Sequence, residues 1–303
     1  MILDITPRTL LPWRTIDESI FLYGLCCSWV FINISFNYDG FSMKRVPMTE
    51  EEEYRNAGIT KEECRKTPEE KGKKISVKYK MKKNNKYIYV HAASATDHGS
   101  RTYDVNGSRL PSVTTILSAT KDQSFLTKWK NRVGHEEAER IKNYSGKRGT
   151  SMHKFIEKYI QKSGYEDLTP IGVEAKPMAQ KIIESGLKPI SHYYGSEVTL
   201  YYPGLYAGST DLVCEHEGKD TIVDFKQSNR PKREEWIEDY YLQIAAYAMA
   251  HDHIHGSSIE QGIIMVCTPD LYFQEFRFEG DKMREYRHKF LERLSQYHVQ
   301  NVS

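Results

Sequence analysis

The sequence predicts an α/β protein with a mixed central β-sheet flanked by helices, plus a helical N-terminal part. The order of elements favours this class: helical segments come first, then strand-like runs in adjacent pairs, a helix, two more strands and a last helix. Hydrophobic residues make up 39% of the 303 residues and aromatic residues 12%, enough to bury a sizeable core. The chain length fits one large domain or two small ones.

The chain divides into an N-terminal extension, residues 1–86, and a globular domain, residues 87–300. Residues 20–36 are largely apolar, but the run is shorter than the roughly 20 residues of a spanning helix. It therefore reads as a buried strand pair or as an extension without a role. Met43 offers an alternative start, in which case residues 1–42 would not belong to the protein.

A second part of the extension separates its charges. Residues 49–70 are rich in Glu, whereas residues 71–86 hold eight lysines and no acidic residue. Such a segment is typical of a solvated, weakly structured arm. It is either a plain linker or a basic arm that contacts phosphates.

In the globular domain, residues 86–92 and 101–107 predict a hairpin, and residues 111–120 predict a strand or turn leading into a helix. The predicted helices are residues 123–140, 146–162, 174–187, 232–250 and 280–297. The later predicted strands are residues 195–202, 205–216, 220–226, 261–268 and 271–278. The helix over 146–162 carries a buried-stripe pattern, and Thr150 or Ser151 is its expected N-cap.

One predicted hairpin carries charges where a half-buried strand pair should be apolar. A two-residue turn at Glu217-Gly218 places Asp211 opposite Asp224, with Cβ atoms about 4.5–5.5 Å apart. Lys226 follows on the same face as Asp224. Two carboxylates this close repel each other unless a cation lies between them. The pattern therefore predicts a site for Mg²⁺ or Mn²⁺ that acts on a phosphodiester.

Charge and cysteine content narrow the class further. The net charge of +2 is too small to indicate nucleic-acid binding, so that argument must rest on local clusters. The five cysteines form no Cys-x-x-Cys pair, which argues against a zinc knuckle and suits a reduced, intracellular protein. We expect the protein to act in the cytoplasm of a bacterium or of a virus-infected cell, or in a mitochondrion. The sequence carries no convincing targeting signal.

Four segments together resemble the RecB-like branch of the PD-(D/E)xK nuclease superfamily. They are GTSMHKFIE, AGSTDLV, TIVDFK and QIAAY, which supply a helical His, an Asp, Asp-x-Lys and Gln-x-x-x-Tyr in that order. Within that branch, residues 103–297 are most similar to the mitochondrial genome maintenance exonuclease group. The resemblance implies a restriction-endonuclease-like core, with Gln227 standing where many relatives carry Thr.

The resemblance also implies roles for individual residues. It assigns the metal to His153, Asp211, Asp224 and the Phe225 carbonyl. Lys226 would be the catalytic lysine. Glu197 would serve a second metal or orient a lysine, and Glu157 would accompany His153.

Other residues are predicted to contact DNA. Gln243 and Tyr247 lie four apart on a helix, so they face one groove and reach the DNA backbone or the catalytic lysine. Basic residues beside an aromatic ring suit single strands, because they combine phosphate contact with base stacking. The predicted DNA contacts are Lys128, Trp129, Lys130, Arg148, Ser228, Gln243 and Tyr247.

The sequence thus predicts a monomeric, Mg²⁺- or Mn²⁺-dependent deoxyribonuclease that trims single-stranded DNA ends or flaps in replication, repair or recombination. It would act away from membranes. An iron–sulfur cluster is not expected, because only Cys267 follows Gln243. Two alternatives stay open: a binding module that holds metal and DNA without cutting, and a λ-type exonuclease that forms a ring on duplex ends.

Overall fold

The computed structural model describes residues 30–33, 44–47 and 81–301. The chain forms two compact units, Met1–Glu63 and Cys64–Ser303. In the first, β1 (Val30–Asn33) pairs antiparallel with β2 (Lys44–Pro47). The rest of the predicted apolar run and most of the lysine-rich arm lie outside the described residues. The predicted domain boundary after residue 86 stays a prediction.

The second unit is built on a six-stranded mixed sheet in the order β11-β10-β9-β8-β7-β3. Its strands are β3 (Lys82–Lys83), β7 (Ile190–Tyr202), β8 (Tyr206–His216), β9 (Lys219–Gln227), β10 (Gln261–Cys267) and β11 (Phe273–Glu279). Strands β9 and β10 run parallel and are joined by helix α7, as a parallel pair requires. The other pairs are antiparallel except β3 with β7. The predicted fold class is confirmed.

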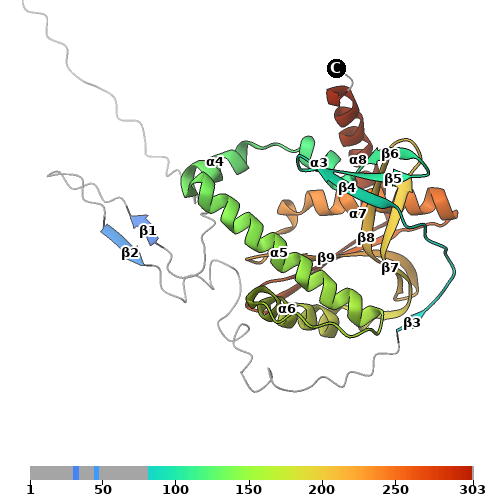
Figure 1. The fold of residues 1–303 in the computed structure, drawn as a ribbon, viewed down its shortest axis with the longest axis horizontal. Coiled ribbons are helices and arrows are strands. Elements are labelled where there is room, and N and C mark those ends of the chain that lie inside the picture. The colour runs from blue at the N-terminus through green and yellow to red at the C-terminus, as the bar shows by residue number, and fades with distance from the viewer. Residues whose placement is uncertain (1–29, 34–43, 48–80, 302–303) are drawn as a thin grey trace, which may run out of the picture. The chain divides into compact units, whose positions relative to one another are not determined.

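Helices cover both faces of this sheet (Figure 1). One face packs against α5 (His135–Ile160) and α6 (Pro170–Gly186) through Leu212, Val223 and Phe225. The other face packs against three further helices through Val213 and Ile222. These helices are α3 (Val113–Ala119), α7 (Glu238–His255) and α8 (Gly280–Asn301). Adjacent residues of β8 and β9 therefore serve opposite cores, as strand alternation requires.

A small sheet and a short helix lie between β3 and the long helix α5 in the chain. Strands β4 (Ala93–Asp97), β5 (Ser100–Val105) and β6 (Ser108–Pro111) form a three-stranded antiparallel sheet. It packs against the ends of β7 and β8 through a small apolar cluster. Helix α4 (Ser124–Val133) then leads to the N-terminal end of the long α5 (Figure 1).

Two sequence predictions for residues 86–120 were wrong. The first strand of the predicted hairpin is not 86–92 but Ala93–Asp97, because the turn lies at His98-Gly99, where both residues have positive φ. Residues 113–119 form a helix, although their β-branched run favours a strand. Ser112 starts this helix, since its hydroxyl accepts a hydrogen bond from the Thr115 amide at 2.9 Å.

The helix boundaries from 123 to 162 also differ from the prediction. The predicted helix over 123–140 is broken at Gly134, whose φ of 92° ends α4. Helix α5 then continues through the predicted start at 146, so Thr150 and Ser151 are not N-caps. The Thr150 hydroxyl donates to the Gly146 carbonyl at 3.1 Å, as an interior helical threonine does. The later strands and helices match the prediction to within a few residues, α6 and α7 being shifted at their starts.

Candidate active site

The hairpin of β8 and β9 has the predicted register. Glu217 and Gly218 have φ values of 51° and 82°, as a two-residue type I′ turn needs. His216 pairs with Lys219, and the ladder continues to Leu212 opposite Val223. The next pair in this register is Asp211 opposite Asp224, so the prediction is confirmed up to the residue before the two carboxylates.

The strands separate at the two aspartates. The Phe225 amide donates to the Asp211 Oδ2 atom at 2.6 Å instead of continuing the backbone ladder. In a strand, the N–H and C=O of one residue point to the same side. The Phe225 carbonyl therefore lies on the β8 side of β9, and its role as a metal ligand stays a prediction.

Three potential ligands meet beside this hairpin. Single ligand atoms of His153, Glu197 and Asp211 all lie within 4.8 Å of one another. His153 comes from α5, and its Nδ1 atom lies 3.2 Å from Asp211 Oδ1. Glu197 lies on β7, between the pairs that Ser196 and Val198 form with β8, and so faces Asp211. Residues from one helix and two strands thus converge on one point.

Glu197 adopts a backbone conformation that its residue type rarely takes. Its φ is 54°, in the left-handed region, where a non-glycine residue is strained. Such strain is found preferentially at functional sites. In this conformation Glu197 joins the group of His153 and Asp211. Glu157 is not in this group, and its carboxylate pairs with Lys154 at 2.7 Å.

Asp224 and Lys226 form the second half of the site. The Lys226 ammonium lies against Asp224 Oδ2, and the Tyr240 ring lies 5.1 Å from the same ammonium. Gln243 Nε2 donates to Asp224 Oδ1 at 3.2 Å. Asp224 Oδ2 is buried and receives no hydrogen bond of normal geometry from the described residues. The cation that this buried oxygen contacts is the Lys226 ammonium.

The pKa shifts reflect this crowding of charges. Burial, reinforced by the Asp211 carboxylate, raises the pKa of Asp224 despite the Lys226 ammonium. For Asp211, burial is outweighed by His153 and Lys226, so its pKa is lowered. Burial of His153 opposes its charged form, but Asp211 outweighs it and raises the pKa of the imidazole. In this state His153 and Lys226 serve as counter-ions to the two aspartates.

The predicted DNA-contacting residues fall into two groups. Gln243 points at Asp224 instead of outward, and the Tyr247 ring is buried, with its hydroxyl 3.2 Å from Gln243 Nε2. Ser228 is buried as well. Lys128 is exposed on α4, with Trp129 and Lys130 beside it partly exposed. In this structure the first group supports the site, and the second stays accessible to a ligand.

Arg148 is buried instead of facing solvent. Its guanidinium donates to Gln227 Oε1 through two nitrogens, at 3.1 and 2.6 Å, and also bonds to Glu174 and Asn229. A phosphate contact would require these bonds to break. Arg148 therefore ties α5 and α6 to the end of β9, which makes it a positioning residue.

Sequence reasoning missed Tyr240. It lies three residues before Gln243 on α7, so Tyr240, Gln243 and Tyr247 share the helical face that meets the site. The spacing alone could have suggested it. The contact with Lys226 depends on how α7 packs on β9.

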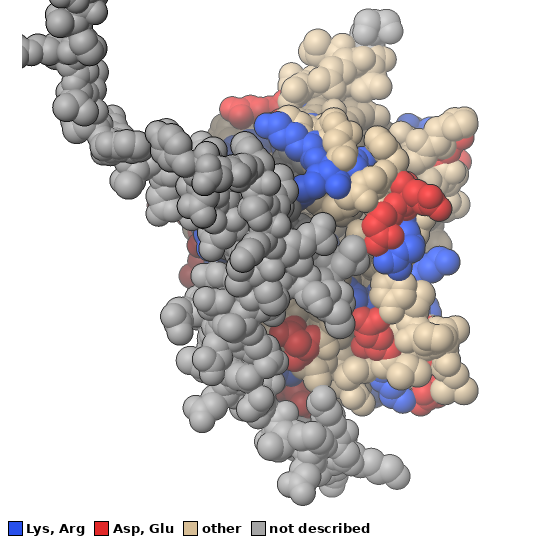
Figure 2. Space-filling model, turned by 90° about the vertical axis from the view of Figure 1, so that its left-hand side faces the viewer, with Lys and Arg blue, Asp and Glu red and all other residues tan. Residues whose placement is uncertain are grey.

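The long helix α5 separates the site from Lys128, Trp129 and Lys130 on α4. His135 and His153 stand 18 positions apart on it, a rise of about 27 Å. On the described part of the face in Figure 2, basic and acidic side chains alternate, and no patch of one sign dominates. The charge of this face therefore does not define a DNA path.

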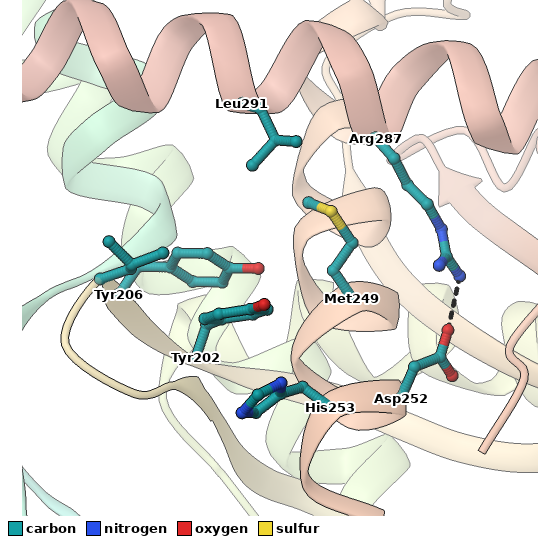
Figure 3. Close-up of a pocket in the computed structure, with 8 residues that line it drawn as sticks. Tyr202, Tyr206, Met249, Asp252, His253, Arg287 and Leu291 are labelled. Carbon is teal, nitrogen blue, oxygen red and sulfur yellow. Dashed lines mark hydrogen bonds and ion pairs between the residues drawn. The ribbon is translucent and has the colours of Figure 1, made fainter. Parts of the chain in front are cut away.

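A separate pocket of about 350 Å³ lies between β7, α7 and α8 (Figure 3). The rings of Tyr202 and His253 stack there with centroids 4.4 Å apart, and Asp252 pairs with Arg287 at 2.8 Å. None of its lining residues belongs to the predicted site. No described helix combines the length and the apolar character that a bilayer span requires.

The chain is similar to known exonucleases. It is 33% identical over 204 residues to mitochondrial genome maintenance exonuclease 1 of Mus musculus, and 30% identical over 210 residues to that of Homo sapiens. The alignments cover 62% of this chain in both cases, and the chain spans 59% and 58% of these relatives. The predicted resemblance to this exonuclease group is confirmed.

Two further comparisons add little. No family model matches the chain. A provisionally assigned exonuclease of Eubacterium rectale, whose structure is solved, shares 13% identity and a TM-score of 0.37 over 52% of this chain and 69% of its own. We base no argument on that likeness.

Proposed function

We propose that the protein is a metal-dependent DNA exonuclease of the PD-(D/E)xK type, RecB-like branch. Its substrates would be single-stranded DNA ends or flaps that arise in replication, repair or recombination. The observation that carries the proposal is the meeting of His153, Glu197 and Asp211 beside the Asp224–Lys226 pair. The similarity to exonucleases supports it.

The ligand set fits a divalent cation. His153, Asp211, Asp224 and the Phe225 carbonyl would hold it, with Glu197 at its edge. Mg²⁺ or Mn²⁺ bound there would supply Lewis acidity toward a phosphodiester and lower the pKa of a water molecule. Because the set mixes an imidazole nitrogen with carboxylate oxygens, it suits Mn²⁺ better than Mg²⁺.

The remaining groups orient this centre. Lys226 keeps its positive charge, because the Asp224 and Asp211 carboxylates outweigh burial and raise its pKa. Its ammonium can stabilise negative charge that develops on the phosphate. Gln243 fixes the Asp224 carboxylate, and Tyr240 confines the ammonium from one side. The exposed Lys128 and the partly exposed Trp129 would bind the strand before it reaches the centre.

The test is an oligonucleotide degradation assay with single- and double-stranded DNA, labelled at either end, in Mg²⁺, Mn²⁺ or EDTA. We expect single strands to shorten only with metal, faster in Mn²⁺ than in Mg²⁺ at equal concentration. Asp211→Asn, Asp224→Asn and Lys226→Met should each lower the rate by at least about 10²-fold, as losing one preorganised charged group does.

Asp220→Asn is the matched control. Asp220 is also a β9 carboxylate, but it bonds to Lys86, Tyr87 and Tyr194. Its variant should keep the wild-type rate. DNA retarded on a gel without cleavage in any metal would identify a binding module instead. Preference for duplex ends by a stable trimer would identify a λ-type exonuclease.

A further inference from the structure

Lys232 lies six residues beyond Lys226, in the segment that joins β9 to the short 3₁₀ helix η2 (Glu234–Trp236). Its backbone is held from both sides by one side chain. Gln274 of β11 accepts from the Lys232 amide at 2.6 Å and donates to its carbonyl at 2.9 Å. The position of Lys232 is therefore fixed by the sheet.

The Lys232 side chain is partly buried. No described residue forms an ion pair or a side-chain hydrogen bond with its ammonium. Burial, and then the nearby Lys121 ammonium, lower the pKa of Lys232. Lys282, by contrast, is paired with Glu234. Because partly buried charges are usually paired, the unpaired state of Lys232 calls for a ligand.

Its surroundings are short of negative charge. Lys121 and Arg293 both lie against the Asp239 carboxylate, with Arg293 Nη1 at 3.5 Å from Oδ1. Two cations thus share one carboxylate, and Lys232 adds a third positive charge. Asp239 is in the first turn of α7, directly before Tyr240, which contacts Lys226. Lys232 itself lies in the segment that directly follows β9, the strand of Asp224 and Lys226.

We propose that Lys232 binds a backbone phosphate of the substrate strand next to the scissile one. This inference rests on the proposed function, since it deepens the description of that site. A phosphodiester carries the charge that Lys232 lacks as a partner. The same strand would continue from Lys226 along the segment that Gln274 anchors.

The experiment measures binding of a fluorescent single-stranded oligothymidylate in EDTA, where hydrolysis is not expected, between about 50 and 200 mM KCl. One phosphate contact on a single strand adds about −0.7 to the slope of log K against log salt. Lys232→Met should therefore have a slope less steep by about 0.7. Over this fourfold change in salt, wild type should lose about 2.6-fold more affinity than the variant.

Two controls isolate the charge. Lys232→Arg should keep the wild-type slope, and Lys282→Met should too, because that lysine is already paired. Urea unfolding of each variant checks that the fold is retained. A wild-type slope for Lys232→Met, in a protein that binds and cleaves DNA, would overturn this inference alone. A wild-type protein that neither binds nor cleaves would overturn the proposed function itself.

Discussion

Replacing Gly208 by Ala tests how the fold supports the site. Gly208 lies on β8 opposite Leu200, under the ring of Tyr247. A Cβ atom there would lie 2.6 Å from Tyr247 Cε1, 3.0 Å from its hydroxyl oxygen and 3.2 Å from Cζ. Carbon atoms in contact are normally about 3.5–4.0 Å apart. The ring, which is only 2% exposed, must therefore shift by about 1 Å.

The shift should affect both stability and activity. Overpacking a core position usually destabilises by about 1–3 kcal/mol. Ala also lowers the conformational entropy of the unfolded chain, which stabilises the fold by about 0.4–1 kcal/mol. We therefore expect the free energy of unfolding to fall by about 1–2 kcal/mol in total. Tyr247 also contacts Gln243, which bonds to Asp224. Because a 1 Å displacement can lower a rate by about 10²-fold, hydrolysis should fall more than stability suggests.

Urea unfolding and the degradation assay measure the two effects. Gly146→Ala is the matched control, because its Cβ would meet nothing within 4 Å. Since Gly146 is inside α5, that change should stabilise by about 1 kcal/mol or less. If Gly208→Ala unfolds within about 0.5 kcal/mol of wild type and hydrolyses DNA equally fast, Tyr247 does not press on β8 and the reasoning fails.

Two further predictions concern buried polar groups. Burial, with the nearby His255, lowers the pKa of the fully buried His251 to about 3. As pH falls below about 6.5, the unfolded chain gains a proton that the folded one excludes, so the free energy of unfolding should fall by about 1.4 kcal/mol per pH unit. His251→Gln should flatten this dependence between about pH 6 and 4 in urea unfolding, and an unchanged slope would contradict the assignment. Arg148→Met should destabilise by about 2–3 kcal/mol, because Gln227 and Glu174 lose their donor. Arg148→Lys should recover little of it, since an ammonium cannot replace the guanidinium fork; a loss below about 0.5 kcal/mol for the Met variant would exclude the network.

The centre of the site could be predicted because it depends on local chemistry. The Glu217-Gly218 turn fixes the hairpin register, and the register holds up to Leu212 opposite Val223, the pair next to Asp211 and Asp224. Strand alternation then puts Lys226 on the same face as Asp224, as its contact with that carboxylate shows. Each step involves residues near one another in sequence, where turn geometry leaves few alternatives.

Sequence-based prediction failed where contacts between residues far apart in the chain determine the structure. The predicted helix start at residue 146 was wrong, because α5 continues through it, and a Cβ on Gly149 would lie 3.3 Å from the Gln227 side chain. Glycine here allows β9 to approach the helix, which no local propensity reveals. Sequence reasoning predicted that Arg148 contacts DNA, because its burial could not be foreseen from neighbouring residues. Its partners lie 26 to 81 residues away, so its burial depends on how three elements meet.

The candidate site lies where β8 and β9 separate. In a regular ladder the Phe225 amide would donate to a backbone carbonyl of β8 and would not bond to the Asp211 carboxylate. Here the Asp211 carboxylate accepts that amide and also lies 3.2 Å from His153. One side chain thus ends the ladder and begins the site. His153 and Lys226 contact the two aspartates from either side of this point.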